Sequence, residues 1–383
     1  MKKIPLFFIL FFATFQWFSA QAKYETFQSQ KLGEERQIKI LLPRNYESNT
    51  DKTYPLLIVL DGDYLFEVVS GNVDFLSYWE EMPEAIVVGI NQYDKRYDDC
   101  MYSAQNGLPI ESGAHFFEFV GGELIPYLER NFRIGNFKIA VGHGDTANFI
   151  NYFMLKPDPI FRGYVAMSPE FAPQMIDYLP QRLGSMEQKI FYCLSDTALD
   201  TGSIKNMVSA LNTDIKSKEN DNVQYQFNSF ETPSHYAMPA QAIPRALEFM
   251  FKVFQPISKQ EYQDTILKLE GSPVAYLNEK YQAILESYGI EKPILVNDFK
   301  AIAAAIEKNK LFQDYEELGK MAIKMYPDTL LGLYYMGRFY EESGEPKKAM
   351  RTFESAYALD EIGGITKDMA MDRADAIKAD FGY

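Results

Sequence analysis

The 383-residue sequence contains few residues that could build a covalent or metal-bound core. It has two cysteines, Cys100 and Cys193, and three histidines. Two thiols in a chain of this length do not make a disulfide framework, so two separate buried thiols are expected, with a Cys100–Cys193 disulfide as the alternative. The sequence has no close cluster of histidine, cysteine and aspartate, so it predicts neither a metal site nor a cofactor.

Positive charge is also scarce. The chain carries 38 Lys and Arg against 53 Asp and Glu, a formal net charge of -15. Nucleic acids and anionic membrane surfaces repel such a chain, so neither is an expected partner. Apolar side chains make up 47% of the sequence and are ample for packed cores.

Long apolar runs are missing except at the start. Lys2 and Lys3 precede the apolar run Ile4–Phe18, and Ala20-Gln21-Ala22 forms an A-x-A cleavage pattern. This run is too short for a membrane-spanning helix, so residues 1–22 are predicted to be a signal peptide. The mature chain then begins at Lys23 with a net charge of -17 once Lys2 and Lys3 are removed, and it is expected to be secreted or periplasmic, with no membrane span.

From Lys23 to about Val253, strand-like and helix-like patterns alternate. Gln37–Leu42 alternates polar and apolar residues, as an antiparallel edge strand does. The other expected strands are Tyr54–Leu60, Ala85–Ile90, Phe137–Val141, Tyr164–Met167, Ile190–Leu194 and Val223–Phe230, and helices are expected at His115–Arg130 and Ile243–Phe254. This order predicts an α/β fold whose mostly parallel sheet is covered on both faces, with its site at the carboxyl ends of the strands.

The remaining residues, 257–383, contain no convincing strand and many helix-forming residues. Part of this segment has the spacing of a tetratricopeptide (TPR) repeat, carried by Leu333–Gly337, Tyr340, Ala349, Phe353 and Ala356. An earlier copy around Ala322 is degenerate, because Gly319 occupies a phenylalanine position. The sequence therefore predicts residues 23–256 as one domain that buries its own core, and residues 257–383 as a small TPR-like helical domain able to bind a protein partner.

The segment Val141–Asn148 lies between an expected strand and a helix-like run, as a nucleophile elbow does. In the Gly-x-Ser-x-Gly elbow, small neighbours allow a strained serine to point into the site. In this chain Gly144 occupies the serine position and Thr146 occupies the closing glycine position. The pattern predicts an elbow without its nucleophile.

Several segments, in order, resemble the putative esterase family of α/β-hydrolases, which includes ferric-enterobactin esterase-like and esterase D-like proteins. These are Tyr54–Gly62, Val88–Asn91 with Arg96 and Asp98, Glu123–Tyr127, Ala166–Pro169 and Ser234–Pro239. The resemblance covers roughly Tyr24–Phe254. It implies the α/β-hydrolase fold and ester hydrolysis by a serine, a histidine and an acid. Tyr236 replaces the glycine that usually follows the catalytic histidine.

The resemblance also assigns the remaining site residues. His235 takes the place of the general base, and Asp196, after the strand Ile190–Leu194, that of its acid partner, with Asp200 as the alternative. Asp145 either replaces the nucleophile or caps the following helix. The backbone after Asp61-Gly62, including Asp63 and Tyr64, would form the oxyanion hole and pocket together with His143 and the N–H of Asp145. Ser168 corresponds to a turn serine, and Arg96 with Asp98 to an ion pair at a mouth lined by Tyr93 and Tyr97, or to a solvated loop.

Three functions remain open at this point. The first is an esterase-like fold, impaired by Gly144, that binds a small ester-like ligand or serves as a scaffold. The second is an active carboxylic ester hydrolase that uses water held by His235, or Asp145, in place of serine. In the third, the helical segment from Ile257 is the working part and binds a protein, with the hydrolase domain as its platform.

Overall fold

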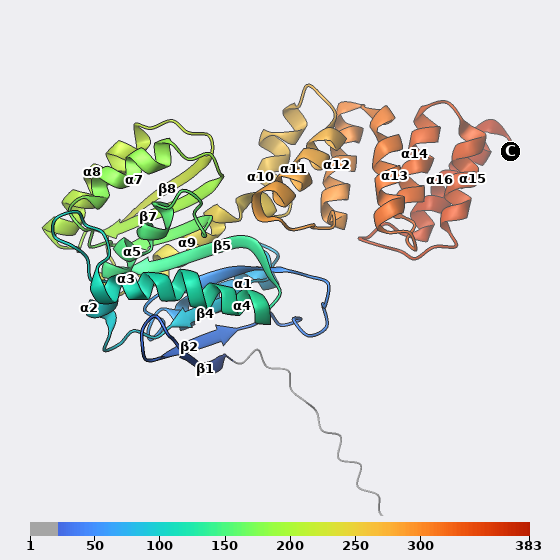
Figure 1. Cartoon of the computed structure of the whole chain (residues 1–383). Helices are drawn as coiled ribbons and strands as arrows, with labels where there is room; N and C mark the ends of the chain where they lie inside the picture. Colours follow the sequence, from blue (N-terminus) through green and yellow to red (C-terminus); the bar gives the residue numbers. More distant parts are fainter. Residues whose placement is uncertain (1–21) are drawn as a thin grey trace, which may run out of the picture.

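A single eight-stranded sheet organises the first two thirds of the chain (Figure 1). The structure is a computed structural model that describes residues 22–383, so the predicted signal peptide lies almost entirely outside the described residues. The strands are β1 (Lys23–Gln28), β2 (Glu35–Leu41), β3 (Tyr54–Val59), β4 (Ile86–Ile90), β5 (Ile134–His143), β6 (Gly163–Met167), β7 (Ile190–Thr197) and β8 (Val223–Phe230).

The strand order is β1-β2-β4-β3-β5-β6-β7-β8. β2 runs antiparallel to both of its neighbours, and all pairs from β4 to β8 are parallel. The predicted mostly parallel sheet is therefore confirmed. The prediction of β2 as an edge strand is wrong, because β1, which the sequence pattern did not reveal, covers its outer side.

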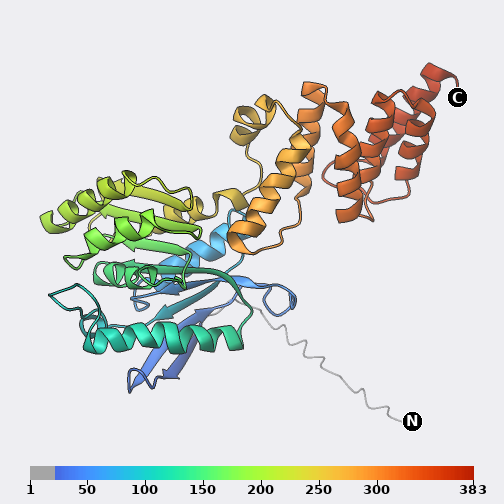
Figure 2. The same cartoon turned by 45° about the horizontal axis from the view of Figure 1, so that its top comes forward.

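Helices cover both faces of the sheet and continue beyond it (Figure 2). They are α1 (Phe66–Tyr78), α2 (Arg96–Asp99), α3 (Glu111–Glu118), α4 (Ile125–Asn131), α5 (Asp145–Phe149), α6 (Asn151–Met154), α7 (Met175–Gly184), α8 (Gly202–Lys216), α9 (Pro239–Met250), α10 (Lys259–Asp264), α11 (Pro273–Tyr288), α12 (Val296–Asn309), α13 (Tyr315–Met325), α14 (Leu331–Glu342), α15 (Pro346–Ala356) and α16 (Lys367–Phe381). A π-helical segment, Phe119–Leu124, joins α3 to α4, so the expected helix His115–Arg130 is part of a longer helical run.

Two separate apolar cores lie on the two faces of the sheet. Residues of α3, α4, α7 and α8 pack on one face, and residues of α1, α9 and α11 pack on the other. Successive side chains of a strand point to opposite faces, so β7 sends Tyr192 and Leu194 to the first core and Phe191 and Cys193 to the second. Cys100 and Cys193 are both buried free thiols, and the disulfide alternative is not formed.

The helix α11 belongs to the second core although it lies beyond the predicted boundary at residue 256. Tyr288 packs edge-on against Phe137 with ring centroids 5.2 Å apart, and its hydroxyl donates to the carbonyl of Met250 at 2.7 Å. Ile284, one turn earlier, is fully buried in the same core. Residues 23–256 therefore do not complete the second core by themselves.

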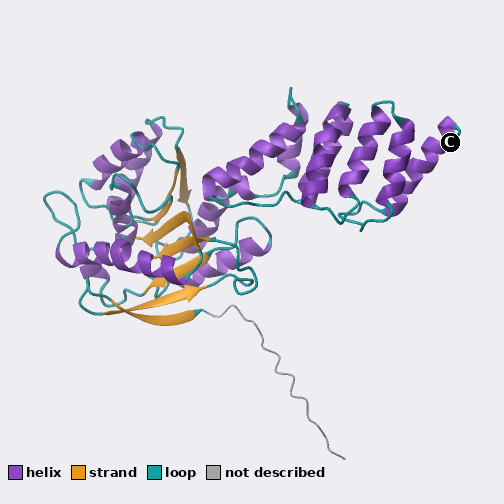
Figure 3. Ribbon diagram, turned by 45° about the vertical axis from the view of Figure 1, so that its right-hand side comes forward, coloured by secondary structure: helices purple, strands orange, loops and turns teal. Residues whose placement is uncertain are grey.

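The remaining helices form an antiparallel array that extends away from the sheet (Figure 3). α14 and α15 approach each other closely, because a Cβ atom on Gly337 would lie 2.4 Å from the ring of Phe353. Ala349 and Ala356 of α15 are buried in the same apolar core as that ring. This packing agrees with the predicted helical character of residues 257–383, while their assignment as TPR repeats stays a prediction. In residues 22–383 no helix has the length and apolar character needed to cross a membrane.

Candidate active site at the carboxyl edge of the sheet

The turn between β5 and α5 has the backbone of a nucleophile elbow. Gly144 lies between these elements at φ 61° and ψ -120°, a conformation that side chains rarely adopt. Its N–H donates to the carbonyl of Met167 at 3.0 Å, which fixes the turn to the neighbouring strand. A Cβ atom on Gly142 would lie 2.5 Å from the carbonyl oxygen of Thr146, so glycine is required there too.

Thr146, at the closing glycine position of the elbow, is fully buried and hydrogen-bonded. Its hydroxyl donates to Oδ2 of Asp61 at 2.7 Å and accepts from the backbone N–H of His143 at 2.9 Å. The Thr146 side chain therefore stabilises the turn. It connects the elbow to the buried carboxylate that follows β3.

His235 faces the empty side-chain position of Gly144. A Cβ atom on Gly144 would lie 4.0 Å from Nε2 of His235, a distance that a serine hydroxyl could bridge. On its other side, Nδ1 of His235 lies 2.7 Å from Oδ1 of Asp200. Asp200 is buried and also accepts from the hydroxyl of Ser168 at 2.6 Å and from the N–H of Thr197 at 2.9 Å. The imidazole of His235 is thus held by a buried carboxylate on one side and faces Gly144 on the other.

The acid beside His235 is Asp200 and not Asp196, which the sequence analysis favoured. Asp196 is the penultimate residue of β7, and strand alternation places it on the same face as Tyr192 and Leu194. His235 precedes α9, which covers the opposite face. The carboxylate of Asp196 is buried there, and burial raises its pKa. It therefore cannot orient the imidazole.

Arg96 of α2 closes the site from above Gly144. Its Nε donates to Oδ1 of Asp61 at 2.8 Å, its Nη1 to Oδ2 of Asp145 at 2.5 Å, and its Nη2 to the carbonyl of His143 at 2.8 Å. Burial opposes the charged form, but the adjacent Asp61 carboxylate prevails and raises the pKa of Arg96.

The position of Arg96 contradicts the expected ion pair with Asp98 and limits the role of Asp145. The expected Arg96–Asp98 ion pair is wrong, because the guanidinium contacts Asp61 and Asp145 instead. The carboxylate of Asp145 is bound by Arg96 and is therefore not free to act as a nucleophile. It does not cap α5 either, because no side-chain hydrogen bond caps this helix. A Cβ atom on Gly144 would lie only 3.1 Å from Nη2 of Arg96 and 3.8 Å from Oε1 of Glu170.

Two of the backbone N–H groups expected to form the oxyanion hole, those of Gly62 and Tyr64, are already engaged. The N–H of Gly62 donates to the carbonyl of Ile90 at 2.7 Å, and the carboxylate of Asp63 accepts from the N–H of Gln92 at 2.6 Å. The hydroxyl of Tyr64 donates to Oδ2 of Asp61 at 3.0 Å. Gly62 therefore offers its N–H to the sheet and not to a substrate.

His143 is a buried neighbour of His235. Its Nδ1 lies 3.1 Å from the hydroxyl of Tyr64, and its ring centroid lies 4.4 Å from that of His235. Burial first, and then the charges of His235 and Arg96, lower the pKa of His143 to about 3. His143 is therefore neutral at physiological pH and contributes shape and hydrogen bonding, not charge.

The sequence pattern did not reveal that Arg96 pairs with Asp61 beside the elbow, or that Ser168 donates to Asp200. Asp61, Ser168 and Arg96 all belong to segments that the family resemblance had picked out, at the carboxyl ends of β3 and β6 and at the start of α2.

The tyrosines near the site are exposed. Tyr93 and Tyr97, expected at the mouth, are 89% and 83% exposed, and the equally exposed Tyr236 packs edge-on against His235 with ring centroids 4.9 Å apart. In residues 22–383 there is no group of three His, Cys, Asp or Glu side chains that could hold a metal ion.

Comparison with known proteins places this geometry in context. Residues 29–149 match the family described as putative esterase. The chain is similar to the crystal structure of an uncharacterised protein from Capnocytophaga ochracea, with 28% identity and a TM-score of 0.86 over 94% of this chain and 100% of that chain. This coverage includes most of the C-terminal helices.

Two further structures share the fold at lower identity. An IroE-like serine hydrolase from Shewanella oneidensis is 17% identical, with a TM-score of 0.59 over 79% of this chain and 98% of that chain. The BES protein from Bacillus cereus is 20% identical, with a TM-score of 0.52 over 65% of this chain and 98% of that chain. A search among curated proteins found no match. The strand order, the elbow and the family match together make this chain an α/β-hydrolase-fold protein that resembles the putative esterases.

Proposed function

We propose that this chain is an esterase-like protein that has lost serine-dependent hydrolysis and binds a small ligand at the carboxyl edge of the sheet. The observation that carries the proposal is the position of Arg96. Its guanidinium borders the space that the nucleophile's side chain would enter, with Nη2 3.1 Å from the Cβ position of Gly144. Three acceptors hold it there, two of them carboxylates.

The groups around Gly144 favour a ligand with a carboxylate or ester oxygen. Nε2 of His235 can donate to or accept from such an oxygen, depending on which nitrogen carries the proton. Arg96 borders the same space, and the two guanidinium N–H groups that Asp61, Asp145 and the His143 carbonyl leave unused can donate to such an oxygen. With Asp200 bonded to Nδ1, the imidazole is held in one orientation, which reduces the entropy lost when a ligand binds.

A fluorophosphonate probe tests the loss of the nucleophile. Such probes react with activated hydroxyl groups, and residue 144 has none, so intact protein should remain unlabelled and should hydrolyse p-nitrophenyl acetate and butyrate no faster than the buffer. Ligand binding is tested in parallel by titrating butyrate into the protein and into an Arg96→Lys variant, which keeps the charge but loses the planar fork. Stoichiometric labelling of any serine, Ser168 included, would contradict the proposal.

Hydrolysis by water activated at His235 is the second candidate, and one observation favours it. The His235–Asp200 pair is complete, and the missing serine side chain leaves space between Nε2 and the elbow backbone. A water molecule in that space could lose its proton to His235 as it attacks an ester carbon. The candidate requires slow ester hydrolysis that His235→Ala abolishes while the fluorophosphonate probe still finds no target.

We also propose export to the periplasm or the exterior, supported by the cleavage pattern at Ala20-Gln21-Ala22. N-terminal sequencing of exported material should give Lys23 as the first residue. An intact Met1 in the cytoplasm would contradict this proposal.

The predicted role of residues 257–383 in binding a protein partner is tested by a pull-down that compares the whole chain with a variant altered only on exposed residues of α13–α16.

A further inference from the structure

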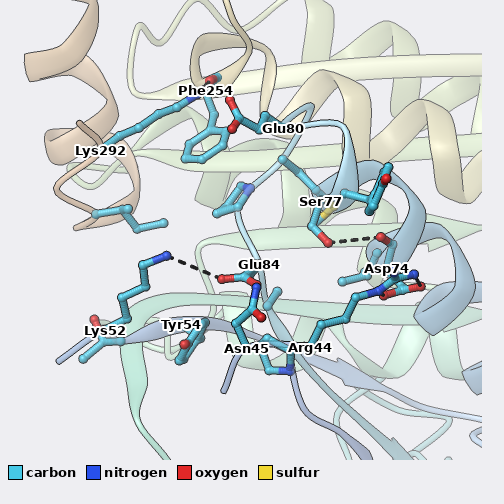
Figure 4. A pocket seen from close by; sticks show the side chains of 18 of the residues that line it. Arg44, Asn45, Lys52, Tyr54, Asp74, Ser77, Glu80, Glu84, Phe254 and Lys292 are labelled. Atoms are coloured by element: carbon cyan, nitrogen blue, oxygen red, sulfur yellow. Dashed lines mark hydrogen bonds and ion pairs between the residues drawn. The ribbon is translucent and has the colours of Figure 1, made fainter. Parts of the chain in front are cut away.

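A cavity of about 680 Å³ lies at the edge of the sheet opposite the elbow (Figure 4). Tyr54, the first residue of β3, forms part of its wall, and residues 289–295, between α11 and α12, close it from the other side. Gly144 follows the carboxyl end of β5, which runs parallel to β3, so the two sites lie at opposite ends of the same strands. The volume of the cavity is in the range of cavities that hold small organic ligands.

The inner wall of this cavity is apolar and its rim is charged. Val73, Met82 and Phe254 are buried side chains that line it. On the rim, Arg44 pairs with Asp74 at 2.6 Å and Lys52 pairs with Glu84 at 3.6 Å. These four charges already neutralise one another, so they offer little net attraction to a ligand; the other charged residues that line the cavity are Lys292, Asp51, Glu80 and Glu291.

Lys292 is different, because its ammonium group has no carboxylate partner among the described residues within salt-bridge distance. Its Nζ donates to the carbonyl of Phe254 at 2.6 Å and lies 3.9 Å from the centre of the Phe254 ring. By contrast, the shielded ammonium groups of Lys39 and Lys280 contact Glu67 at 2.7 Å and Glu261 at 2.9 Å. Burying an ammonium group costs free energy because the group loses its hydration, and for Lys292 no paired carboxylate offsets that cost. The negative charge of a bound ligand would offset it.

The charged groups around Lys292 explain its protonation. Burial lowers its pKa to about 8, although the carboxylates of Glu80, Asp298 and Glu81 raise it. Lys280, the remaining neighbouring charge, is held by Glu261. Asp298 is itself engaged, by the hydroxyl of Tyr281 at 2.8 Å and the N–H of Ile257 at 2.9 Å. Most of Lys292 is therefore protonated at pH 7 and is available to an anion.

We propose that this cavity binds a small organic carboxylate, with its apolar body against Val73, Met82 and Phe254 and its carboxylate on Lys292. Segments from both sides of the cavity then share the ligand: β3 and α1 from the sheet region, and residues 289–295 from the helical region. Occupancy would stabilise the packing of these two regions, because a ligand that binds only the folded chain raises its free energy of unfolding.

Calorimetric titration of the full chain with octanoate, octanol and octylamine tests the proposal. All three have the same apolar tail, so only the head group differs. Octanoate should bind more tightly than octanol by about tenfold, which corresponds to one charge-assisted contact. Octylamine should bind least well, because its ammonium group meets Lys292.

Variants locate the site. Lys292→Met should weaken octanoate binding by about tenfold and leave octanol unchanged, because it removes only the charged contact. Lys52→Met, on the same rim but paired with Glu84, is the matched control and should change octanoate binding by less than about twofold. If Lys292→Met fails to fold, the wild type still decides, because octanoate binding should weaken as the pH rises from 7 to 10 and Lys292 loses its proton, while octanol binding stays constant.

The proposal is wrong if octanol binds as tightly as octanoate, or if octylamine binds best. It is also wrong if octanoate binds the Lys292→Met variant as tightly as it binds the wild type, or if the wild type binds octanoate as tightly at pH 10 as at pH 7. Absence of saturable octanoate binding below about 10 mM would contradict it as well. None of these outcomes bears on the fluorophosphonate and ester assays, so this site and the Gly144 site fail or succeed separately.

Discussion

A serine side chain at position 144 would enter a space that Arg96 already borders. The backbone conformation of the elbow, the His235 imidazole and the Asp200 carboxylate are present, so in the proposed function the missing hydroxyl is one of two obstacles to hydrolysis. The other is the guanidinium, which three acceptors hold 3.1 Å from the Cβ position. Removing Arg96 outright would leave the buried Asp61 carboxylate without its counter-ion, a costly change.

Gly144→Ser should therefore give a small, measurable rate of p-nitrophenyl acetate hydrolysis above the wild type. The gain should depend on the observed acid: adding Asp200→Asn should return the rate to that of the wild type, since the imidazole loses its orientation. Adding Asp196→Asn is the matched control and should leave most of the gain. Equal effects of the two substitutions would show that the pairing seen in the structure does not operate during catalysis.

His143 makes stability depend on pH at this site. Its pKa lies at about 3 in the folded chain, against an ordinary value of 6.5, so the folded state holds the ring neutral while the unfolded chain takes up a proton. This contribution to stability is present above pH 6.5 and is lost as the pH falls from 6.5 towards 3. Between pH 7 and pH 5 the loss amounts to about 2 kcal/mol.

Urea unfolding at pH 7 and pH 5, for the wild type and for His143→Asn, measures this loss. Asparagine keeps a polar nitrogen near the Tyr64 hydroxyl but does not titrate. The free energy of unfolding of the wild type should fall by about 2 kcal/mol more than that of the variant between these pH values. An identical decrease in both proteins would mean that His143 is protonated normally in the folded state.

At the scale of elements, the turn between β5 and α5 is held by a side chain that the esterase pattern does not contain. Thr146 connects the N–H of His143 to the carboxylate of Asp61, and thereby β5 to the loop after β3. Replacing Thr146 with the family's glycine would not simply relax the elbow. It would remove a hydrogen bond from a buried carboxylate, so a more active Gly144→Ser variant is not expected from that change.

Thr146→Val should lower the free energy of unfolding by about 1–3 kcal/mol, because it leaves a buried donor and a buried acceptor without this partner. Thr146→Ser keeps the hydroxyl and should cost less than about 1 kcal/mol. Urea unfolding of the two variants checks the difference. Similar stability of both would indicate that water replaces the threonine hydroxyl.

At the scale of the whole molecule, α11 makes the hydrolase sheet depend on the chain beyond residue 257. Its residues Ile284 and Tyr288 fill the second core, next to Phe137, Phe191 and Phe251. We therefore propose that the unit that folds by itself ends after α11, near Leu295, and that the predicted division near residue 257 marks only a change of pattern. Ending the chain at Ile257 would expose a set of aromatic side chains to water.

Truncation tests this boundary. A chain ending at Ile257 should be less stable and prone to aggregation, whereas a chain ending at Leu295 should remain soluble. In the full chain, Tyr288→Ala should cost about 3–5 kcal/mol through lost packing, and Tyr288→Phe about 1 kcal/mol through the lost hydrogen bond to Met250. A stable, soluble chain ending at Ile257 would show that the sheet buries its own core, as the sequence pattern suggested.

From the sequence alone, the absence of a hydroxyl at position 144 and most of the helices and strands could be predicted. A glycine at position 144 has no hydroxyl in any fold, and the apolar runs at Tyr54–Leu60 and Ile190–Leu194 are too short and too continuous for anything but buried strands. The mostly parallel sheet could be predicted from the local sequence pattern, because alternating strands and helices fit few other arrangements. The first strand escaped notice because its exposed edge position imposes little apolar pattern.

Tertiary structure alone decided which of these residues meet. Asp196 and Asp200 both follow one apolar run, and the choice between them depends on which face α9 covers, which no local pattern specifies. Arg96 reaches Asp61 and Asp145 only because the ends of β3, β4 and β5 lie side by side in the sheet. The same holds for Tyr288, whose partners are 38 to more than 100 residues earlier in the chain. Contacts between distant residues depend on packing, and a linear pattern of side chains does not encode them one by one.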